Sequence, residues 1–231
     1  MSRSLLLEIQ DREALCRLCP RLVAWREAAA GAPPPRFRGE TYWARPVPSF
    51  GDPTGRVLIV GLAPAAHGGN RTGRVFTGDR SGDWLFRALW KAGFANQPTS
   101  VGLADGLELG DCLVTAACHC APPDNKPTPE ELRLCRPFLH EEMRALPELR
   151  VLIGLGKIGF QAAFEAARDC GLTELARCPA FAHGTTSQLS ATLTLIGSYH
   201  PSQQNTFTRR LTEPMFDAVF ESARAALRPA G

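Results

Sequence analysis

The chain has 231 residues, of which 44% are apolar and 21% charged, and its formal net charge is +3 at pH 7. This length suits one α/β domain, and no apolar run approaches the roughly 18 residues of a membrane span. So weak a positive charge does not by itself indicate a nucleic-acid partner. The start, MSRSLLLEIQDRE, lacks the pattern of a signal peptide, so we expect a cytoplasmic protein with no membrane partner.

Helical and strand patterns alternate along the chain. Helices are predicted over residues 8–29, 83–94 and 157–171, and two more begin at Thr128 and at about residue 213. Residues 31–55 are rich in Pro and Gly and should be mostly loop. Short apolar runs typical of buried strands cover residues 56–62, 112–117, 151–156 and 192–200. This alternation predicts one domain, 1–231, with a parallel sheet covered by helices on both faces.

Two helix ends carry clear local signals. Thr128 is a candidate N-cap, Pro129 suits the first helical position and Glu131 completes a capping box. Gly171 is placed to end the helix predicted before it.

Polar segments follow three of the predicted strands: GLAPAAHGGNRTG at 61–73, CHCAPPDNKPT after the second strand, and HPSQQNT after the fourth. Because ligands of open α/β sheets bind at the carboxyl ends of the strands, these segments define a candidate pocket. The first segment has no Lys of a phosphate-binding P-loop, and it does not run directly into a helix as a dinucleotide fingerprint does. It is therefore neither of these two sites.

Eight cysteines are present, and without an export signal we expect metal binding or burial rather than a disulfide framework. Cys16 and Cys19 form a C-x-x-C pair, and Cys120 precedes Cys135 by fifteen residues. This spacing suits a tetrahedral zinc site or a [4Fe–4S] cluster. The other four are expected to be packed or free thiols: Cys112, Cys118, Cys170 and Cys178.

Three segments together resemble one known family: GLAPAAHGGNRTGRVFTGD (61–79), CAPPDNKPTPEELRLCRPFL (120–139) and HPSQQNTFT (200–208). With the C-R-L-C start, they resemble the iron–sulfur uracil-DNA glycosylases, and the branch called family 5, or type b, more closely than family 4. The resemblance implies a three-layer α/β/α sandwich with a central four-stranded parallel sheet. It also implies a [4Fe–4S] cluster held by the four spaced cysteines, Cys16, Cys19, Cys120 and Cys135.

The same resemblance implies the chemistry of base excision. Members hydrolyse the N-glycosidic bond of uracil, and in this branch of other deaminated or damaged bases such as hypoxanthine, xanthine and ethenocytosine, leaving an abasic site. His200 matches the motif histidine that lies near uracil O2. Asp79 is the candidate to orient water or face the sugar cation, although an N-cap role is the rival interpretation. Asn125 is a weaker candidate for water or base contact, with a turn role as its rival.

The expected base pocket has an apolar wall. Leu62 and Ala63 follow Gly61 at positions where family 1 and family 4 carry an acid, and this departure is characteristic of family 5. Phe76 matches the aromatic residue that stacks on the flipped base. Ala116 stands where family 4 has the asparagine that selects uracil, which predicts a broad range of bases.

Contacts to DNA are expected from two places. Asn70 and Arg71 are expected to shape the mouth of the pocket or touch the DNA backbone. A polar run after His200 suits phosphate contacts and wedging of the emptied base stack: Ser202, Gln203, Gln204, Asn205, Arg209 and Arg210. Arg209 departs from the family pattern, which tends to show Gly there.

The expected partner is therefore single- or double-stranded DNA, bound by a monomer associated with a prokaryotic nucleoid. Two other hypotheses remain open from the residues alone. One is a nucleic-acid-binding module, stabilised by zinc or a cluster, without catalysis. The other is a small electron-transfer protein that uses the cluster.

Overall fold

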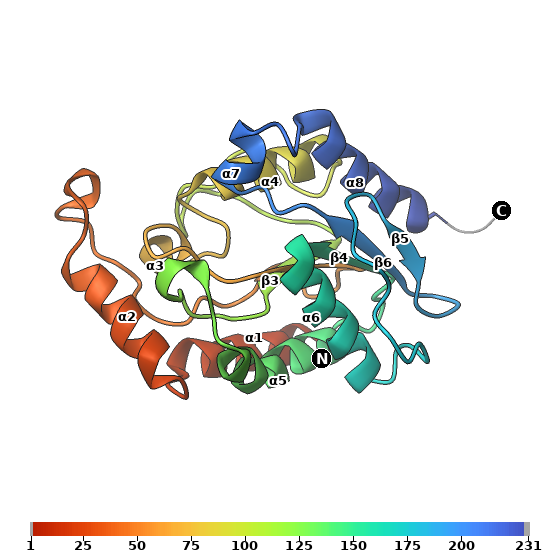
Figure 1. The fold of residues 1–231 in the computed structure, drawn as a ribbon, viewed down its shortest axis with the longest axis horizontal. Helices are drawn as coiled ribbons and strands as arrows, with labels where there is room; N and C mark the ends of the chain where they lie inside the picture. The colour runs from red at the N-terminus through yellow and green to blue at the C-terminus, as the bar shows by residue number, and fades with distance from the viewer. Residues whose placement is uncertain (1, 229–231) are drawn as a thin grey trace.

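A computed structural model describes residues 2–228 of the chain and shows a sheet between two layers of helices (Figure 1). The strand order is β1-β3-β2-β4-β6-β5. The four central strands pair in parallel: β3 (Cys112–Ala116), β2 (Val57–Gly61), β4 (Val151–Leu155) and β6 (Thr194–Ser198). They correspond to the four predicted strands, so the parallel centre of the sheet is confirmed.

Two short edge strands were not predicted from the sequence. β1 (Phe50–Gly51) pairs antiparallel with β3, and β5 (Thr186–Gln188) pairs antiparallel with β6. Both are too short to show a hydrophobic period, and β1 lies inside the Pro-rich segment. The sheet is thus six-stranded and mixed, with the expected four-stranded parallel sheet as its centre.

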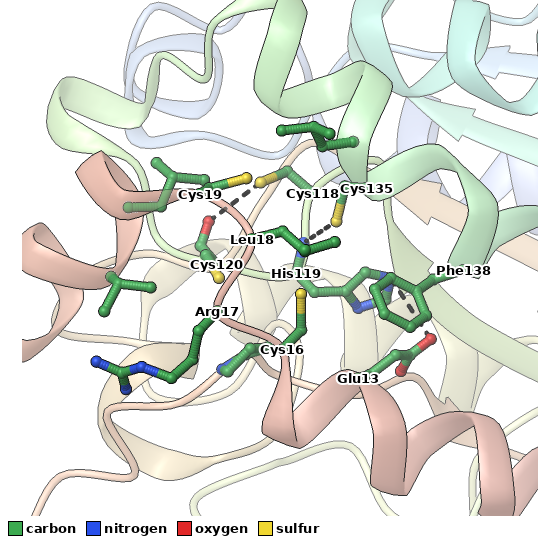
Figure 2. Close-up of a pocket in the computed structure, with 14 residues that line it drawn as sticks. Glu13, Cys16, Arg17, Leu18, Cys19, Cys118, His119, Cys120, Cys135 and Phe138 are labelled. Atoms are coloured by element: carbon green, nitrogen blue, oxygen red, sulfur yellow. Dashed lines mark hydrogen bonds and ion pairs between the residues drawn. The ribbon is translucent and has the colours of Figure 1, made fainter.

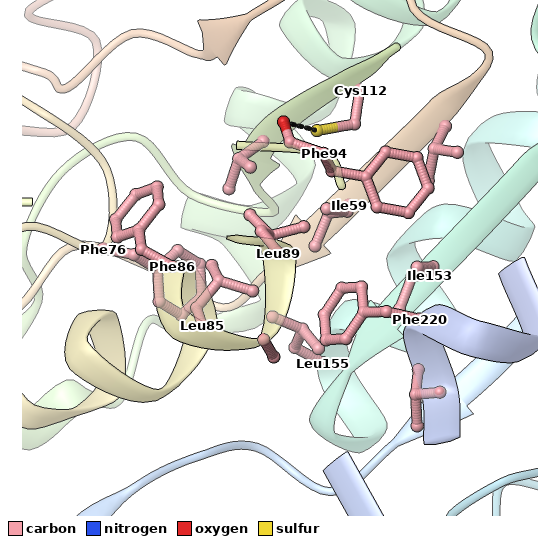
Figure 3. Close-up of a cluster of buried hydrophobic side chains, with 14 of the residues drawn as sticks. Ile59, Phe76, Leu85, Phe86, Leu89, Phe94, Cys112, Ile153, Leu155 and Phe220 are labelled. Carbon is pink, nitrogen blue, oxygen red and sulfur yellow. Dashed lines mark hydrogen bonds between the residues drawn. The ribbon is translucent and has the colours of Figure 1, made fainter. Parts of the chain in front are cut away.

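Helices cover both faces of the sheet (Figure 1). One layer holds α4 (Arg80–Lys91), α7 (Gln203–Phe207) and α8 (Glu213–Ala226); the other holds α1 (Ser2–Leu15), α5 (Pro129–Ala145) and α6 (Gly156–Asp169). Each layer encloses its own apolar core, and the core beneath α4 and α8 is drawn in Figure 3. Two further helices, α2 (Pro20–Gly31) and α3 (Gly69–Thr72), lie beside the sheet. Within residues 2–228, no helix is both long and apolar enough to cross a bilayer.

The single helix predicted over residues 8–29 is wrong. The chain leaves helical geometry after Leu15 and enters α2 at Pro20, which has no backbone N–H for a preceding turn. Leu15 and Leu18 are 72% and 62% exposed, so these two leucines do not form the buried face of one continuous helix. The break places the Cys16–Cys19 segment in a non-helical turn.

The local helix signals are otherwise confirmed. The Thr128 hydroxyl accepts a bond from the Glu131 N–H at 3.2 Å, and the Glu131 carboxylate accepts one from the Thr128 N–H at 2.7 Å. This is the predicted capping box at the start of α5. Gly171 follows α6 with φ +72°, a left-handed geometry that suits glycine.

Two glycines let α6 lie directly on the sheet. A Cβ on Gly154 would stand 2.2 Å from the Phe160 Cα, and a Cβ on Gly159 would stand 2.4 Å from the Val60 carbonyl oxygen. Both obstacles are backbone atoms, which cannot rotate away. The close approach of helix and sheet therefore requires glycine at both positions.

We expect Gly154→Ala to lower the free energy of unfolding by at least about 3 kcal/mol, because α6 must shift off the sheet. Denaturant unfolding measures this change. Gly31→Ala is the matched control, since nothing lies within 4 Å of the added methyl, and it should change stability by less than about 1 kcal/mol. Equal stability of the two variants would contradict the packing described.

Candidate active site and cysteine pocket

A pocket of about 590 Å³ opens where β2 and β6 end and α4 begins. It brings together nine of the residues predicted from the sequence: Leu62, Ala63, Phe76, Asp79, Asn125, His200, Ser202, Gln203 and Gln204. Pro64, Ala65, Arg80 and Ser81 complete its lining. The pocket therefore combines an apolar wall with one carboxylate and one imidazole.

Asp79 is fixed at the start of α4. Its Oδ1 accepts bonds from the N–H groups of Ser81 at 2.8 Å and Gly82 at 3.2 Å, which makes it the N-cap. The hydrogen bonds found for this carboxylate within residues 2–228 involve Oδ1 alone, and a Cβ on Gly68 would come within 2.5 Å of Oδ2. The rival N-cap interpretation is therefore confirmed, and the second oxygen stays available to the pocket.

His200 stands just beyond β6. Its ring stacks on Phe76 with centroids 5.7 Å apart and planes inclined by 27°. The Asn205 side-chain amide donates to the His200 carbonyl oxygen at 2.8 Å and so holds the turn. Burial lowers the pKa of His200 to about 4, which leaves the imidazole neutral at pH 7.

Phe76 has a backbone conformation that is rare outside glycine. Its φ is +55°, and its ring lies against Gly61, where a Cβ would come within 2.6 Å of the ring. On the other side, a Cβ on Gly82 would stand 1.6 Å from the Phe76 carbonyl oxygen. Gly61 and Gly82 thus leave the space in which Phe76 is held at the pocket, and such strained positions cluster at functional sites.

Asn125 lies in a turn whose residues Asp124 and Asn125 have φ values of +53° and +55°. Its turn role is therefore present, and its side chain also lines the pocket. A second pocket of about 340 Å³ extends the first toward Trp25, Arg36 and Phe37. The two pockets share five lining residues: Ala65, Asp79, Arg80, Asn125 and Gln203.

Two residues at the mouth were missed in the sequence. Phe207 at the end of α7 is 64% exposed, and the Arg80 guanidinium lies 4.5 Å from the centre of its ring. An aromatic residue directly after the polar run HPSQQNT was the signal for Phe207. Arg80 had no comparable signal, because its position depends on where α4 begins.

Asn70 does not face solvent, and its expected contact with DNA is wrong. Its side chain is fully buried, and its amide donates to the carbonyl oxygens of Arg26 and Ala66, both at 3.2 Å. Arg71 is engaged as well, by Glu40 at 2.6 Å and by the His67 carbonyl at 3.0 Å. Arg71 thus shapes the loop, whereas Asn70 fastens it to α2.

The polar run forms the short helix α7. Ser202 is its N-cap, and its hydroxyl accepts a bond from the Asn205 N–H at 3.4 Å. Gln203 and Gln204 are exposed at the pocket. Arg209 has φ +56°, the left-handed geometry in which relatives were expected to have Gly.

Beyond α7, Arg210 is exposed and lies over the Tyr199 ring at 4.6 Å.

Ala116 does not line the pocket, which corrects its predicted contact with substrate. It is the last residue of β3 and pairs with Gly61 of β2. Ala116 is 3% exposed, so its side chain is enclosed in the fold.

The four predicted ligand cysteines meet in a separate small pocket of about 20 Å³ (Figure 2). Two of them receive hydrogen bonds: the buried Arg26 guanidinium donates to the Cys120 Sγ at 2.9 Å, and the His119 N–H donates to the Cys135 Sγ at 3.3 Å. Donors directed at sulfur are typical of thiolates that bind a metal centre.

Burial raises the pKa of Cys19 to about 11 and that of Cys120 to about 12. Thiolates at this depth therefore need a cationic partner such as zinc or iron. The chemistry of this donor set fits either a zinc ion or a [4Fe–4S] cluster.

Cys118 is buried as expected, but it also reaches this pocket. Its Sγ donates to the Cys120 carbonyl oxygen at 3.5 Å, and Figure 2 shows it near Cys19. Spacing alone did not place this fifth sulfur beside the other four, because Cys118 and Cys120 sit on one irregular loop after β3.

Known proteins similar to this chain were found by family model and by sequence. The model of the uracil DNA glycosylase superfamily matches residues 48–224. A Type-5 uracil-DNA glycosylase of Thermus thermophilus is 50% identical over 94% of this chain and 99% of its own length. One of Mycobacterium tuberculosis is 48% identical over 94% of the chain and 80% of its own length, and one of Pyrobaculum aerophilum is 43% identical over 93% and 90%.

His200 provides a test of the site's electrostatics. Because its pKa falls from an ordinary value near 6.5 to about 4 on folding, the unfolded chain binds the extra proton first as the pH drops. Its contribution to stability is therefore constant above pH 6.5 and is lost between pH 6.5 and 4. We expect NMR titration to show a neutral imidazole at pH 5.5, and His200→Asn to have a shallower loss of stability in that range. A His200 pKa near 6.5 would contradict the burial described.

Proposed function

The chain belongs to the uracil-DNA glycosylase superfamily, and on this basis we propose that it hydrolyses the N-glycosidic bond of uracil in DNA. The observation that carries the proposal is the pocket beyond β2 and β6, where Asp79 and His200 line one cavity with the strained Phe76. Its volume of about 590 Å³ admits a single extruded base.

Cleavage of the bond separates an oxocarbenium-like sugar from a uracil anion. A neutral His200 donates a hydrogen bond to the uracil carbonyl oxygen on which negative charge develops. Since the imidazole carries no charge of its own, this hydrogen bond becomes stronger as the anion forms. It therefore stabilises the transition state more than the bound substrate, and this difference raises the rate. The bond from Asn205 to the His200 carbonyl keeps the ring in place during this change.

The Asp79 carboxylate supplies a negative charge for the positively charged sugar. Its Oδ1 is held by the start of α4, and we assign to the other oxygen, Oδ2, the orientation of a water for attack on the sugar. A fixed carboxylate there also favours the positive sugar. Asn125 borders the same space and provides an amide contact to that water or to the base.

The extruded base stacks on Phe76 against the apolar wall of Leu62 and Ala63. DNA lies across α7, where Gln203 and Gln204 are exposed at the pocket mouth. The exposed Phe207 beside them enters the gap that the base leaves. The cations available for phosphate contacts at this edge are Arg80, Arg209 and Arg210.

We extend the proposal to hypoxanthine, xanthine and ethenocytosine, because Ala116 stands where family 4 carries the asparagine that selects uracil, so this reader of one base edge is missing. The enzyme is monofunctional in this proposal: no lysine is among the residues that line the pocket, so none is placed to form a Schiff base with the sugar. Release of each free base from matched single- and double-stranded oligonucleotides tests the range.

For the cysteine pocket we propose a [4Fe–4S] cluster bound by Cys16, Cys19, Cys120 and Cys135. When bound, it serves as a covalent link between the turn after α1, the loop after β3, and α5. The Arg26 and His119 N–H groups support two of these thiolates. The cluster takes no part in the hydrolysis proposed for the base pocket.

The second candidate is a nucleic-acid-binding module without catalysis, stabilised by zinc or a cluster. The exposed α7 surface with its aromatic residue and cations favours binding by itself. A purified protein that binds uracil-containing DNA but releases no base would decide for this alternative.

Asp79→Asn separates the two roles of this residue. Asparagine caps helices about as well as aspartate, so thermal stability should stay near that of the wild type. Loss of the carboxylate should lower the single-turnover rate of uracil release by about 100-fold or more. Asp79→Ala should lose both the rate and about 1 kcal/mol of stability. Full activity of Asp79→Asn would remove Asp79 from the reaction.

Two neighbouring cysteines provide a matched test of the cluster. Cys120→Ser should remove iron, sulfide and the visible absorption of the purified protein, because it deletes a ligand. Cys118→Ser should keep about four irons per chain, since this thiol is not one of the proposed ligands. A colourless wild-type protein that holds one zinc in this pocket would contradict the cluster.

A further inference from the structure

Next to the cysteine pocket lies a second group of potential ligands: Glu13, His119 and Glu142. One ligand atom from each lies within 4.8 Å of the other two, and the three residues are 0%, 2% and 0% exposed. The Glu13 Oε1 stands 3.7 Å from the His119 Nε2, and Figure 2 shows the two side chains facing each other beside Phe138.

The atoms that face one another lack partners. Among the described residues, neither carboxylate oxygen of Glu13, nor the His119 Nε2, nor the Glu142 Oε1 makes a hydrogen bond. Buried polar atoms without partners are costly, and two carboxylates at this depth are more so. An ion bound to all three side chains would satisfy these atoms together.

The outer atoms of the group are arranged as in metal sites. The His119 Nδ1 lies 2.9 Å from the Val47 carbonyl oxygen, which can only accept, so Nδ1 carries the proton and Nε2 offers its lone pair to the centre. The Glu142 Oε2 accepts a bond from the Thr115 hydroxyl at 2.7 Å. Such outer hydrogen bonds orient metal-binding histidines and carboxylates.

We propose that Glu13, His119 and Glu142 bind a divalent metal ion, and that the ion is zinc. One imidazole and two carboxylates are a ligand set that zinc accepts in four-coordinate geometry. Calcium needs six to eight oxygen ligands, and magnesium keeps several waters, so neither suits three side chains in a closed site. The double positive charge balances the two carboxylates.

The alternative occupant is a proton. Burial and the adjacent Glu142 carboxylate raise the pKa of Glu13 to about 11, so without a metal this side chain stays protonated at neutral pH. A zinc ion replaces that proton and also binds the lone pair of the His119 Nε2. A proton shared between the two carboxylates would leave that lone pair without a partner.

The three residues belong to the segments that carry the cysteines. Glu13 precedes Cys16 by three residues at the end of α1, and His119 is adjacent to Cys120. On α5, Glu142 follows Cys135 by seven residues, which places both on the same helix face. A zinc ion here would fasten α1, α5 and the loop after β3 independently of the cysteine pocket.

The test is metal analysis of the full chain produced with added zinc. We expect about one zinc per chain when the iron content is complete, with a zinc X-ray absorption shell of nitrogen and oxygen at about 2.0–2.1 Å. Glu13→Gln and Glu142→Gln should lower the zinc content about tenfold and leave the iron content unchanged. Glu141→Gln is the matched control, because this neighbouring carboxylate pairs with Arg12 at the surface and should keep the zinc.

A second measurement needs no variant. Wild-type protein stripped of zinc by a mild chelator should gain thermal stability as zinc is returned, with the melting temperature rising with concentration. Complete iron without zinc, together with no such gain, would overturn the proposal and leave a proton between Glu13 and Glu142. A zinc shell of sulfur at about 2.3 Å would also overturn it, because the ion would then lie among the cysteines.

Discussion

Parallel pairing of β3, β2, β4 and β6 is the constraint on which the rest of the molecule depends. Because these strands run in the same direction, the segments that leave them emerge at one edge of the sheet. The apolar wall follows β2, the loop with Cys118 and Cys120 follows β3, and His200 follows β6. Segments more than 100 residues apart thus supply one pocket, and the cysteines lie close beside it.

Arg26 connects the cysteine pocket with the loop that forms the apolar wall of the larger pocket. Its guanidinium is buried and donates to the Cys120 Sγ, while its backbone carbonyl accepts a bond from Asn70 in the loop that forms the pocket wall. A charged side chain is stable at such depth only with an anionic partner, which a metal-bound thiolate provides. The cysteine pocket therefore supports the wall through α2, and loss of the proposed cluster would release both the α2 segment and that loop.

The base pocket combines backbone strain with rigid support. Phe76, Asn125 and Arg209 all have positive φ, and each lies at the pocket or at the end of the α7 surface. Such conformations persist only where the surrounding structure supports them, and for Phe76 the missing side chains of Gly61 and Gly82 leave the necessary space. Asp79 is supported in a similar way, since one of its oxygens accepts the two N–H groups at the start of α4 and so fixes the carboxylate at the pocket.

The sequence by itself determined the four central strands, the capping box of α5 and the motifs that identify the family, because each depends on residues close together in the chain. It did not determine the helix break before Pro20, the short edge strands or the burial of Asn70. Nor did it bring Cys118 to the other sulfurs, or Glu13 to His119 and Glu142. Local patterns report backbone preference and the period of burial, whereas contacts between distant segments are decided only when helices pack on the sheet.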